Sequence, residues 1–244
     1  MTKTDQIKIL LQELTKDQQQ EIFEYLKTLF GKHPLEEKLN LDSEAILEAI
    51  YRADELILRN FRGVIAEAAF NRFILRRIGK YEVLDIVGYD SDKYDYLIRA
   101  NSREIRVQVK LQRSEKGKPK ILGNGMYAVE VQRTRTGKRK LTQKPEIGYK
   151  ETELVIQTRP YAFGQFDLIA VCMYPSTGDW SNFMYTVSSW LLPRPNEAHL
   201  IKVIQPVAKE PNDDWTDDFE TCIQWYESNL NKRIANPIAH KKSR

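Results

Sequence analysis

Three side chains in the middle of the chain have the types that metal-assisted phosphate chemistry uses. Asp95 offers a carboxylate, Gln108 an amide oxygen and Lys110 an ammonium group. Carboxylate and amide oxygens are ligands for a hard cation such as Mg²⁺, and an ammonium group stabilises the charge of a phosphate. Brought to one face, these groups could hold a metal ion and a phosphate together.

A β-hairpin would bring them to one face. Residues 94–99 and 105–112 each alternate between apolar and polar side chains, which predicts two strands. With a turn at 100–103, Arg99 lies opposite Glu104 as a favourable charge pair. The same register places the aspartate opposite the glutamine, and the lysine follows two residues along the same face.

A fourth candidate, Glu67, precedes the hairpin in the segment RGVIAEAAF. Apolar residues at helical spacing predict a helix over 61–78, and Gly79 provides a stop signal. The glutamate stands alone among alanines on a segment that must be largely buried. A buried carboxylate needs a cation or a metal as its partner, so Glu67 joins the candidate site.

The remaining elements predict an α/β (α+β) fold in which helices flank a central mixed sheet. An N-terminal helical hairpin packs on the core or forms part of a dimer interface. We expect a hairpin and linker over 1–42, a catalytic domain over 43–233 and a loose basic tail over 234–244. The predicted helices are 5–14, 16–30, 43–59 and 216–230, and the further predicted strands are 81–87, 126–132, 166–174 and 183–190.

Composition favours an ordinary soluble globular protein. The chain has 244 residues, of which 41% are hydrophobic, and no apolar run approaches the length of a membrane helix. The Met1 end is polar and lacks a secretory signal, so we expect a cytoplasmic protein. Two distant cysteines and three scattered histidines argue against a disulfide framework and against zinc or histidine-centred sites.

Positive charge is concentrated after the hairpin. Residues 99–144 contain 14 Lys and Arg against 3 Asp and Glu, a local net of +11, so the rest of this +4 chain sums to −7. Charge runs in general are most often solvated surface. A basic block directly beside the candidate site instead favours a polyanionic partner, because phosphate neutralisation supplies most sequence-independent affinity for nucleic acids.

The order of these residues resembles the PD-(D/E)xK nuclease superfamily, of the type II restriction endonuclease kind. The matching positions are Glu67 on a helix, Asp95 in KYDYLI, and Gln108 and Lys110 in RVQVKLQ, and FGQFDLIAV resembles a later core strand. Two departures stand out: no proline precedes Asp95, and glutamine replaces the usual acid of the last motif. Glu67 would restore the missing negative charge.

This resemblance implies hydrolysis of phosphodiester bonds in double-stranded DNA. Mg²⁺, for which Mn²⁺ can substitute, would be held by Asp95, Gln108, the Val109 carbonyl and Glu67. Lys110 would orient or help deprotonate the attacking water and stabilise the developing oxyanion. A homodimer on a palindromic duplex, with no organic cofactor and no membrane, is also implied.

Base or phosphate contacts are expected from basic and amide side chains downstream of the hairpin, since arginine pairs with guanine edges and glutamine with adenine. These candidates are Arg113, Gln132, Arg133, Arg135, Lys138, Arg139 and Arg159. Three alternatives stay open at this stage. They are a repair or junction-resolving nuclease, a catalytically inactive DNA-binding module, and a protein-interaction domain whose charges are incidental.

Overall fold

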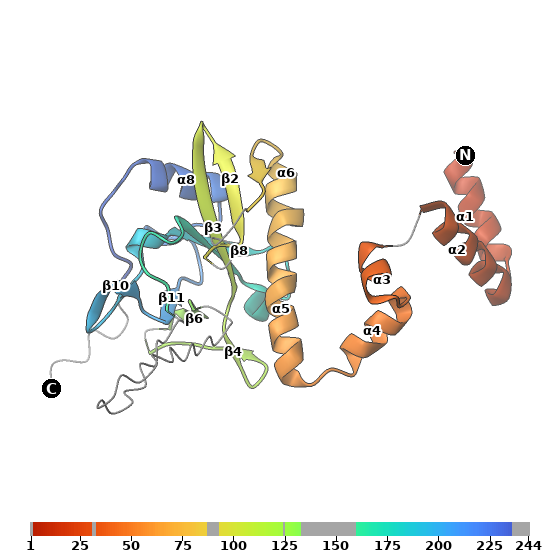
Figure 1. The fold of residues 1–244 in the computed structure, drawn as a ribbon, viewed down its shortest axis with the longest axis horizontal. Helices are drawn as coiled ribbons and strands as arrows, with labels where there is room; N and C mark the ends of the chain where they lie inside the picture. Colours follow the sequence, from red (N-terminus) through yellow and green to blue (C-terminus); the bar gives the residue numbers. More distant parts are fainter. Residues whose placement is uncertain (1, 31–32, 87–92, 124, 133–159, 236–244) are drawn as a thin grey trace, which may run out of the picture. The chain divides into compact units, whose positions relative to one another are not determined.

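The computed structural model describes residues 2–30, 33–86, 93–123, 125–132 and 160–235 (Figure 1). The chain divides into two compact units, Met1–Leu58 and Arg59–Arg244. Each unit is described by itself.

The first unit is helical. Thr2 caps its first helix, and Thr15 and Gln18 bond each other at the start of the second. The stretch predicted as a linker contains a short helix. No helix in the described ranges combines the length and apolar character that crossing a bilayer requires. The helices are α1 (Lys3–Glu13), α2 (Lys16–Phe30), α3 (Pro34–Leu39) and α4 (Ser43–Tyr51).

One long helix predicted from residue 43 to residue 59 is wrong. Helix α4 ends at Tyr51, and α5 (Glu55–Ala69) begins after Asp54, whose carboxylate accepts the amide of Ile57 at 2.9 Å. Asp42 caps α4 through its side chain, which accepts the amide of Ala45 at 2.7 Å. Asp54 caps the start of α5 and so creates the break between the two helices. The apolar periodicity continues across this break and therefore does not reveal it.

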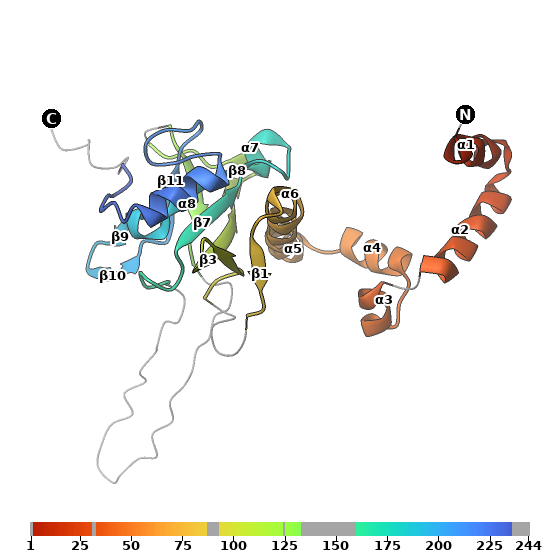
Figure 2. The same cartoon turned by 90° about the horizontal axis from the view of Figure 1, so that it is seen from above.

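The helical path into the second unit ends where the sequence predicts. Helix α5 runs into a π-helical segment, Phe70–Leu75, and then into α6 (Arg76–Ile78). Gly79 stops it with a φ of 67°, a left-handed conformation that glycine adopts without a Cβ penalty. Figures 1 and 2 show α5 running alongside the part of the sheet that contains β1, β2 and β3.

A mixed five-stranded sheet forms the centre of the second unit, in the order β1-β2-β3-β7-β8. The β3 and β7 strands pair in parallel, and the other neighbours pair antiparallel. This architecture confirms the predicted α+β class. The strands are β1 (Glu82–Leu84), β2 (Tyr96–Ala100), β3 (Arg103–Leu111), β7 (Leu168–Cys172) and β8 (Phe183–Val187).

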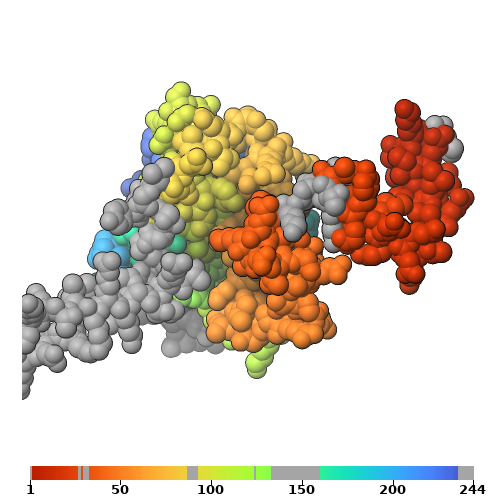
Figure 3. All heavy atoms as spheres, turned by 45° about the vertical axis from the view of Figure 1, so that its right-hand side comes forward, coloured from red at the N-terminus to blue at the C-terminus, as the bar shows by residue number. Residues whose placement is uncertain are grey.

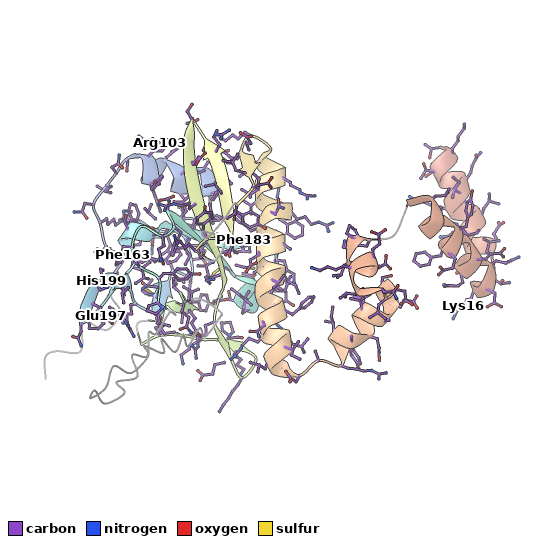
Figure 4. The ribbon with its side chains drawn as sticks, viewed as in Figure 1. Lys16, Arg103, Phe163, Phe183, Glu197 and His199 are labelled. Carbon is purple, nitrogen blue, oxygen red and sulfur yellow. The ribbon has the colours of Figure 1, made fainter. Side chains whose placement is uncertain are left out.

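The predicted hairpin register is confirmed. Arg99 lies opposite Glu104, and Ala100 lies opposite Arg103 across a turn whose residues Asn101 and Ser102 both have positive φ. Figure 4 shows Arg103 at this end of the hairpin. The apolar face of β3 is buried, and the two later apolar strands continue the sheet from β3 as predicted.

An aromatic cluster joins the helices to the sheet. The ring of Phe70 lies 5.3 Å from Phe219 on α8 (Phe219–Glu227) and 5.6 Å from Phe183 on β8, measured between centroids. Strands β7 and β8 are buried along their whole length, as expected for strands covered on both faces. The core therefore fixes the position of β3 from both sides.

Smaller elements surround the sheet, and the strand predicted over 126–132 is confirmed as Tyr127–Glu130. Residues 114–119 form a hairpin. Ile234, assigned to a loose tail, is buried and donates its amide to the Trp190 carbonyl at 2.8 Å. The small elements are β4 (Ser114–Glu115), β5 (Lys118–Pro119), β6 (Tyr127–Glu130), α7 (Tyr174–Thr177), β9 (Pro193–Arg194), β10 (Glu197–Ile201) and β11 (Ile204–Val207). Figure 4 labels Glu197 and His199 on β10.

Candidate active site

Strand β3 carries two of the candidate side chains on one face. Gln108 and Lys110 are two residues apart, so both point to the same side of the sheet. Asp95 lies opposite Gln108, and its amide donates to the Val107 carbonyl at 3.0 Å. Its Oδ2 atom accepts the Val109 backbone amide at 2.7 Å and a hydrogen bond from Gln108 Nε2. Asp95 and Gln108, which the predicted register places opposite each other, are therefore directly hydrogen-bonded.

Glu67 joins this group from helix α5. The Tyr96 hydroxyl on β2 donates to the Glu67 backbone carbonyl at 2.8 Å, which ties the helix to the hairpin at this point. The π-helical segment begins three residues later, at Phe70. A π-helical turn shifts the backbone groups from their positions in an α-helix, and such turns occur frequently at functional sites.

The electrostatics of Glu67 show that it lies close to the other charged groups. Burial and, to a smaller extent, the negative charge of Asp95 together raise the pKa of Glu67 from 4.5 to about 7, against the opposing charge of Lys110. The pKa values of Glu67 and Lys110 therefore each respond to both other charged groups. A carboxyl group with a pKa near neutrality can exchange a proton under physiological conditions.

Asp95 and Lys110 are perturbed in opposite directions by the same environment. Burial raises the pKa of Asp95, and the charge of Lys110 and the hydrogen bonds from Val109 and Gln108 oppose that rise. Burial lowers the pKa of Lys110, against the attraction of Asp95 and Glu67. Two carboxylates and one ammonium in a partly buried site are a pattern typical of catalytic groups, although structural ion pairs can share it.

Lys110 also contacts an aromatic ring. Its Nζ atom lies 5.8 Å from the ring centroid of Tyr161, within the range of a cation–π interaction. Among described residues, no side chain or carbonyl accepts a hydrogen bond from Lys110. The ammonium is thus held by charge and by the ring, and its three donors are available to a ligand.

The amide groups on this face leave hydrogen-bonding capacity unused. Gln108 is 1% exposed, and its Oε1 atom is buried without a hydrogen-bond partner among the described residues. Gln112, two residues beyond Lys110, is also 1% exposed, and both of its amide atoms lack a partner. A buried polar atom without a partner costs about 1–3 kcal/mol of stability. A cation bound to the Gln108 Oε1 atom would offset this cost.

The donor set fits a hard divalent cation. Asp95, Gln108 Oε1, the Val109 carbonyl and Glu67 would supply oxygen ligands, which Mg²⁺ prefers. Within the described part of the chain, no three His, Cys, Asp or Glu side chains group together as a metal site. Any metal here would therefore be held by a mixed set of carboxylate, amide and backbone oxygens.

An ion pair next to the site anchors the start of β3 and β7. Asp167 accepts Arg106 Nε at 2.9 Å and Arg106 Nη2 at 2.7 Å, and it also accepts the Arg106 backbone amide at 2.8 Å. Arg106 Nη1 donates to the Gly164 carbonyl at 2.7 Å. This bidentate arrangement fixes the strand that carries the glutamine and the lysine.

Two of the predicted DNA-contact residues are described, and both are bonded to the same acid. Arg113 forms an ion pair with Glu130 at 2.7 Å, and Gln132 donates its side-chain amide to the other oxygen of that carboxylate. The other five candidates, Arg133, Arg135, Lys138, Arg139 and Arg159, lie outside the described residues.

Sequence reasoning missed Tyr161 and Asp167. Both follow β3 by at least fifty residues, and no spacing rule connects them to it. The only signal was the position of Asp167 directly before a strongly apolar strand, a place where charged residues pair with neighbours across the sheet.

Comparisons with known proteins show a distant structural likeness and no family. No family model and no curated protein matches the chain. Among solved structures, the chain is similar to a bacterial homing endonuclease, with 20% sequence identity and a TM-score of 0.33 over 64% of this chain and 81% of that one.

Proposed function

We propose that this protein is a Mg²⁺-dependent endonuclease that hydrolyses phosphodiester bonds of double-stranded DNA. The observation that carries the proposal is the meeting of Glu67, Asp95, Gln108 and Lys110 at one point of the second unit, with a buried amide oxygen left without a partner. Phosphodiester hydrolysis needs a cation site, a proton acceptor and a cationic group for the oxyanion. These four residues supply all three.

Each side chain has a role that its environment supports. Lys110 donates hydrogen bonds to the phosphate and stabilises the negative charge that builds on it. Glu67, with its pKa near 7, accepts the proton of the attacking water. Asp95 and Gln108 hold the cation site, with Val109 contributing its carbonyl. When bound, Mg²⁺ supplies Lewis-acid stabilisation of the charge on the phosphate.

The finer part of the proposal is a type II restriction enzyme, a homodimer that cuts a specific duplex site with one active site per strand. The resemblance of the motif to restriction endonucleases and the amount of basic sequence beyond β3 support it. Specificity would come from direct readout of base edges, which requires arginine, lysine or amide side chains at the groove.

The first unit supports self-association. None of its described residues is buried, and eleven of its aliphatic residues are exposed, against four in the described part of the second unit. Figure 3 draws these helices in red to orange. The eleven are Ile7, Ile9, Leu10, Leu26, Leu29, Leu35, Leu39, Leu41, Leu47, Leu56 and Ile57, and the four are Val64, Val83, Ile121 and Leu230.

Only another first unit offers comparable apolar surface within the described chain. Eleven aliphatic residues about half exposed present on the order of 1,000 Å², compared with roughly 800 Å² per partner in a standard interface. Residues 1–58 carry seven Lys and Arg against twelve Asp and Glu, which disfavours DNA as the partner of these helices. We therefore place the proposed dimer contact in this unit.

Cleavage of phage DNA tests the activity. The purified full chain is incubated with linear DNA in Mg²⁺ or in EDTA, and the ends of the fragments are sequenced. Discrete fragments with one shared end sequence are expected in Mg²⁺ only. Unselective fragments would support a repair or non-specific nuclease instead of a restriction enzyme.

Substitution of the lysine ties the activity to the site. Lys110→Ala should lower the cleavage rate by at least about 100-fold, because a donor to the oxyanion is lost, while DNA binding persists. Lys202→Ala, a change of the same kind between β10 and β11, should leave the rate unchanged. A Lys110→Ala protein that cuts at the normal rate would refute the assignment.

A further inference from the structure

A short β-hairpin continues directly from the strand that carries the site. Strands β4 and β5 pair with Ser114 opposite Pro119 and Glu115 opposite Lys118, which leaves Lys116 and Gly117 as a two-residue turn. The φ angles of these two residues are 51° and 74°. Positive values at both positions match a type I′ turn, the tight connection that suits the twist of two antiparallel strands.

The base of this hairpin is fixed to strand β6. The Arg113 amide donates to the Ala128 carbonyl at 2.8 Å, and the Ala128 amide donates to the Lys120 carbonyl at 3.1 Å. The Lys120 amide in turn donates to the Arg113 carbonyl at 2.8 Å. Strand β6 therefore holds both legs of the hairpin, and the tip is presented from a rigid base. Figures 1 and 3 show the hairpin projecting at the lower edge of the second unit.

The four cations of the hairpin fall into two pairs. At the base, Arg113 is bonded to Glu130 at 2.7 Å, and Lys120 is bonded to Glu115 at 2.9 Å. At the tip, Lys116 and Lys118 are exposed, and no described carboxylate lies within ion-pair distance of either. The tip thus carries two positive charges that the described part of the protein does not neutralise.

Lys116 occupies a position that other residues would fill with less strain. A left-handed conformation costs an ordinary residue free energy because its Cβ approaches the carbonyl oxygen, whereas glycine and asparagine adopt it readily. Keeping a lysine at such a position favours a use for its charge, since strained residues gather at functional sites.

We propose that the β4–β5 hairpin binds the backbone phosphates of DNA, through Lys116 and Lys118, beside the phosphodiester that is cleaved. The proposal rests on the proposed function. Lys116 follows Lys110 by six residues, so at roughly 3.3 Å per residue it lies within about 20 Å of the site. DNA carries one phosphate per roughly 3.4 Å of axis on each strand, so several phosphates fall within that reach.

The salt dependence of binding tests this role. The dissociation constant of the full chain for a duplex of about 30 base pairs is measured in EDTA at several salt concentrations. Each phosphate contact contributes about 0.9 to the slope of log affinity against log salt. Replacing Lys116 and Lys118 together with glutamine should therefore reduce the slope by about 1.8.

A control pair carries the same change of charge in the first unit. Lys16→Gln with Lys38→Gln should leave the slope unchanged, because both lysines lie on exposed helices of the first unit and not on the hairpin. An equal reduction in this control would show a general charge effect and would overturn the hairpin proposal.

A single substitution separates binding from folding. Lys116→Asn should keep or raise the melting temperature, because asparagine suits the turn, and should still reduce the salt slope by about 0.9. A wild-type slope in the lysine variants, in a protein that binds and cuts DNA, would overturn this inference alone. A wild-type protein that neither binds nor cuts DNA would overturn the proposed function with it.

Discussion

Gln108 donates its side-chain amide to the same Asp95 oxygen, Oδ2, that accepts the backbone amide of Val109. Both hydrogen bonds that Asp95 accepts from described side chains and backbone thus end on one oxygen. This arrangement turns the amide nitrogen of Gln108 toward the carboxylate and leaves its Oε1 buried without a donor. In the proposed cation site, Gln108 would therefore orient Asp95 through its amide nitrogen and offer its Oε1 as an uncharged ligand oxygen.

Gln108→Glu should make the site depend on a cation for stability. The variant loses a donor to Asp95 and places two carboxylates together, so its free energy of unfolding in EDTA should fall by about 1–3 kcal/mol. Added Mg²⁺ should restore more stability to the variant than to the wild type, because three acids now face the ion. Thermal unfolding with and without Mg²⁺ measures both effects.

A matched change, Gln6→Glu on exposed helix α1, should show neither effect. Equal responses of the Gln108→Glu variant and the wild type to Mg²⁺ would remove Gln108 from the proposed cation site.

The raised pKa of Glu67 should appear in the pH dependence of stability. Because its pKa is about 7 in the folded protein and 4.5 ordinarily, the folded state binds the proton more tightly than the unfolded chain. Its contribution to the free energy of unfolding is therefore most favourable below pH 4.5, falls as the pH rises to about 7, and stays low above that value. Glu67→Gln should remove this fall.

Chemical denaturation in EDTA from pH 5 to pH 8 checks this expectation. The difference in stability between Glu67→Gln and the wild type should grow in favour of the variant as the pH rises. Parallel pH profiles for the two proteins would mean that the environment of Glu67 does not favour its neutral form.

Asp167→Asn should destabilise the fold without changing the chemistry. Asp167 is 7% exposed and pairs with Arg106 through both carboxylate oxygens, so the substitution removes the charge that pairs with a partly exposed guanidinium. The free energy of unfolding should fall by about 2–4 kcal/mol, measured with urea. At a temperature where the variant is folded, its cleavage rate should equal that of the wild type.

The exposed Asp217 provides the control for this substitution. Asp217→Asn should change stability by less than about 0.5 kcal/mol. A loss of cleavage in folded Asp167→Asn would instead give this residue a direct part in the reaction.

Charges placed on the first unit should separate the proposed dimer. Leu10→Glu with Leu26→Glu puts two carboxylates on exposed apolar positions of α1 and α2, and burying these in an interface is unfavourable. Light scattering after size exclusion should show a dimer for the wild type and a monomer for the variant. A monomeric wild type would refute this interface, and Lys3→Glu with Lys16→Glu serves as the control on charged positions.

Local pattern was sufficient to predict the hairpin and the three residues it aligns. Alternation with a period of two determines which side chains share a face, and the turn at Asn101 and Ser102 sets the register, so Asp95, Gln108 and Lys110 could be aligned from the sequence alone. The mixed sheet followed from the two buried apolar strands after it. These features depend on neighbours in the sequence or on a short turn.

Tertiary packing decided the rest. The approach of Glu67 to Lys110, the ring of Tyr161 beside the lysine and the Arg106–Asp167 pair join segments that no local period relates. Likewise, the break before α5 and the hairpin at Lys116 depend on which carboxylates and backbone groups find partners. Long-range contacts are fixed by the burial of the whole core, so the sequence named candidate groups whereas only the folded chain brought their charges together.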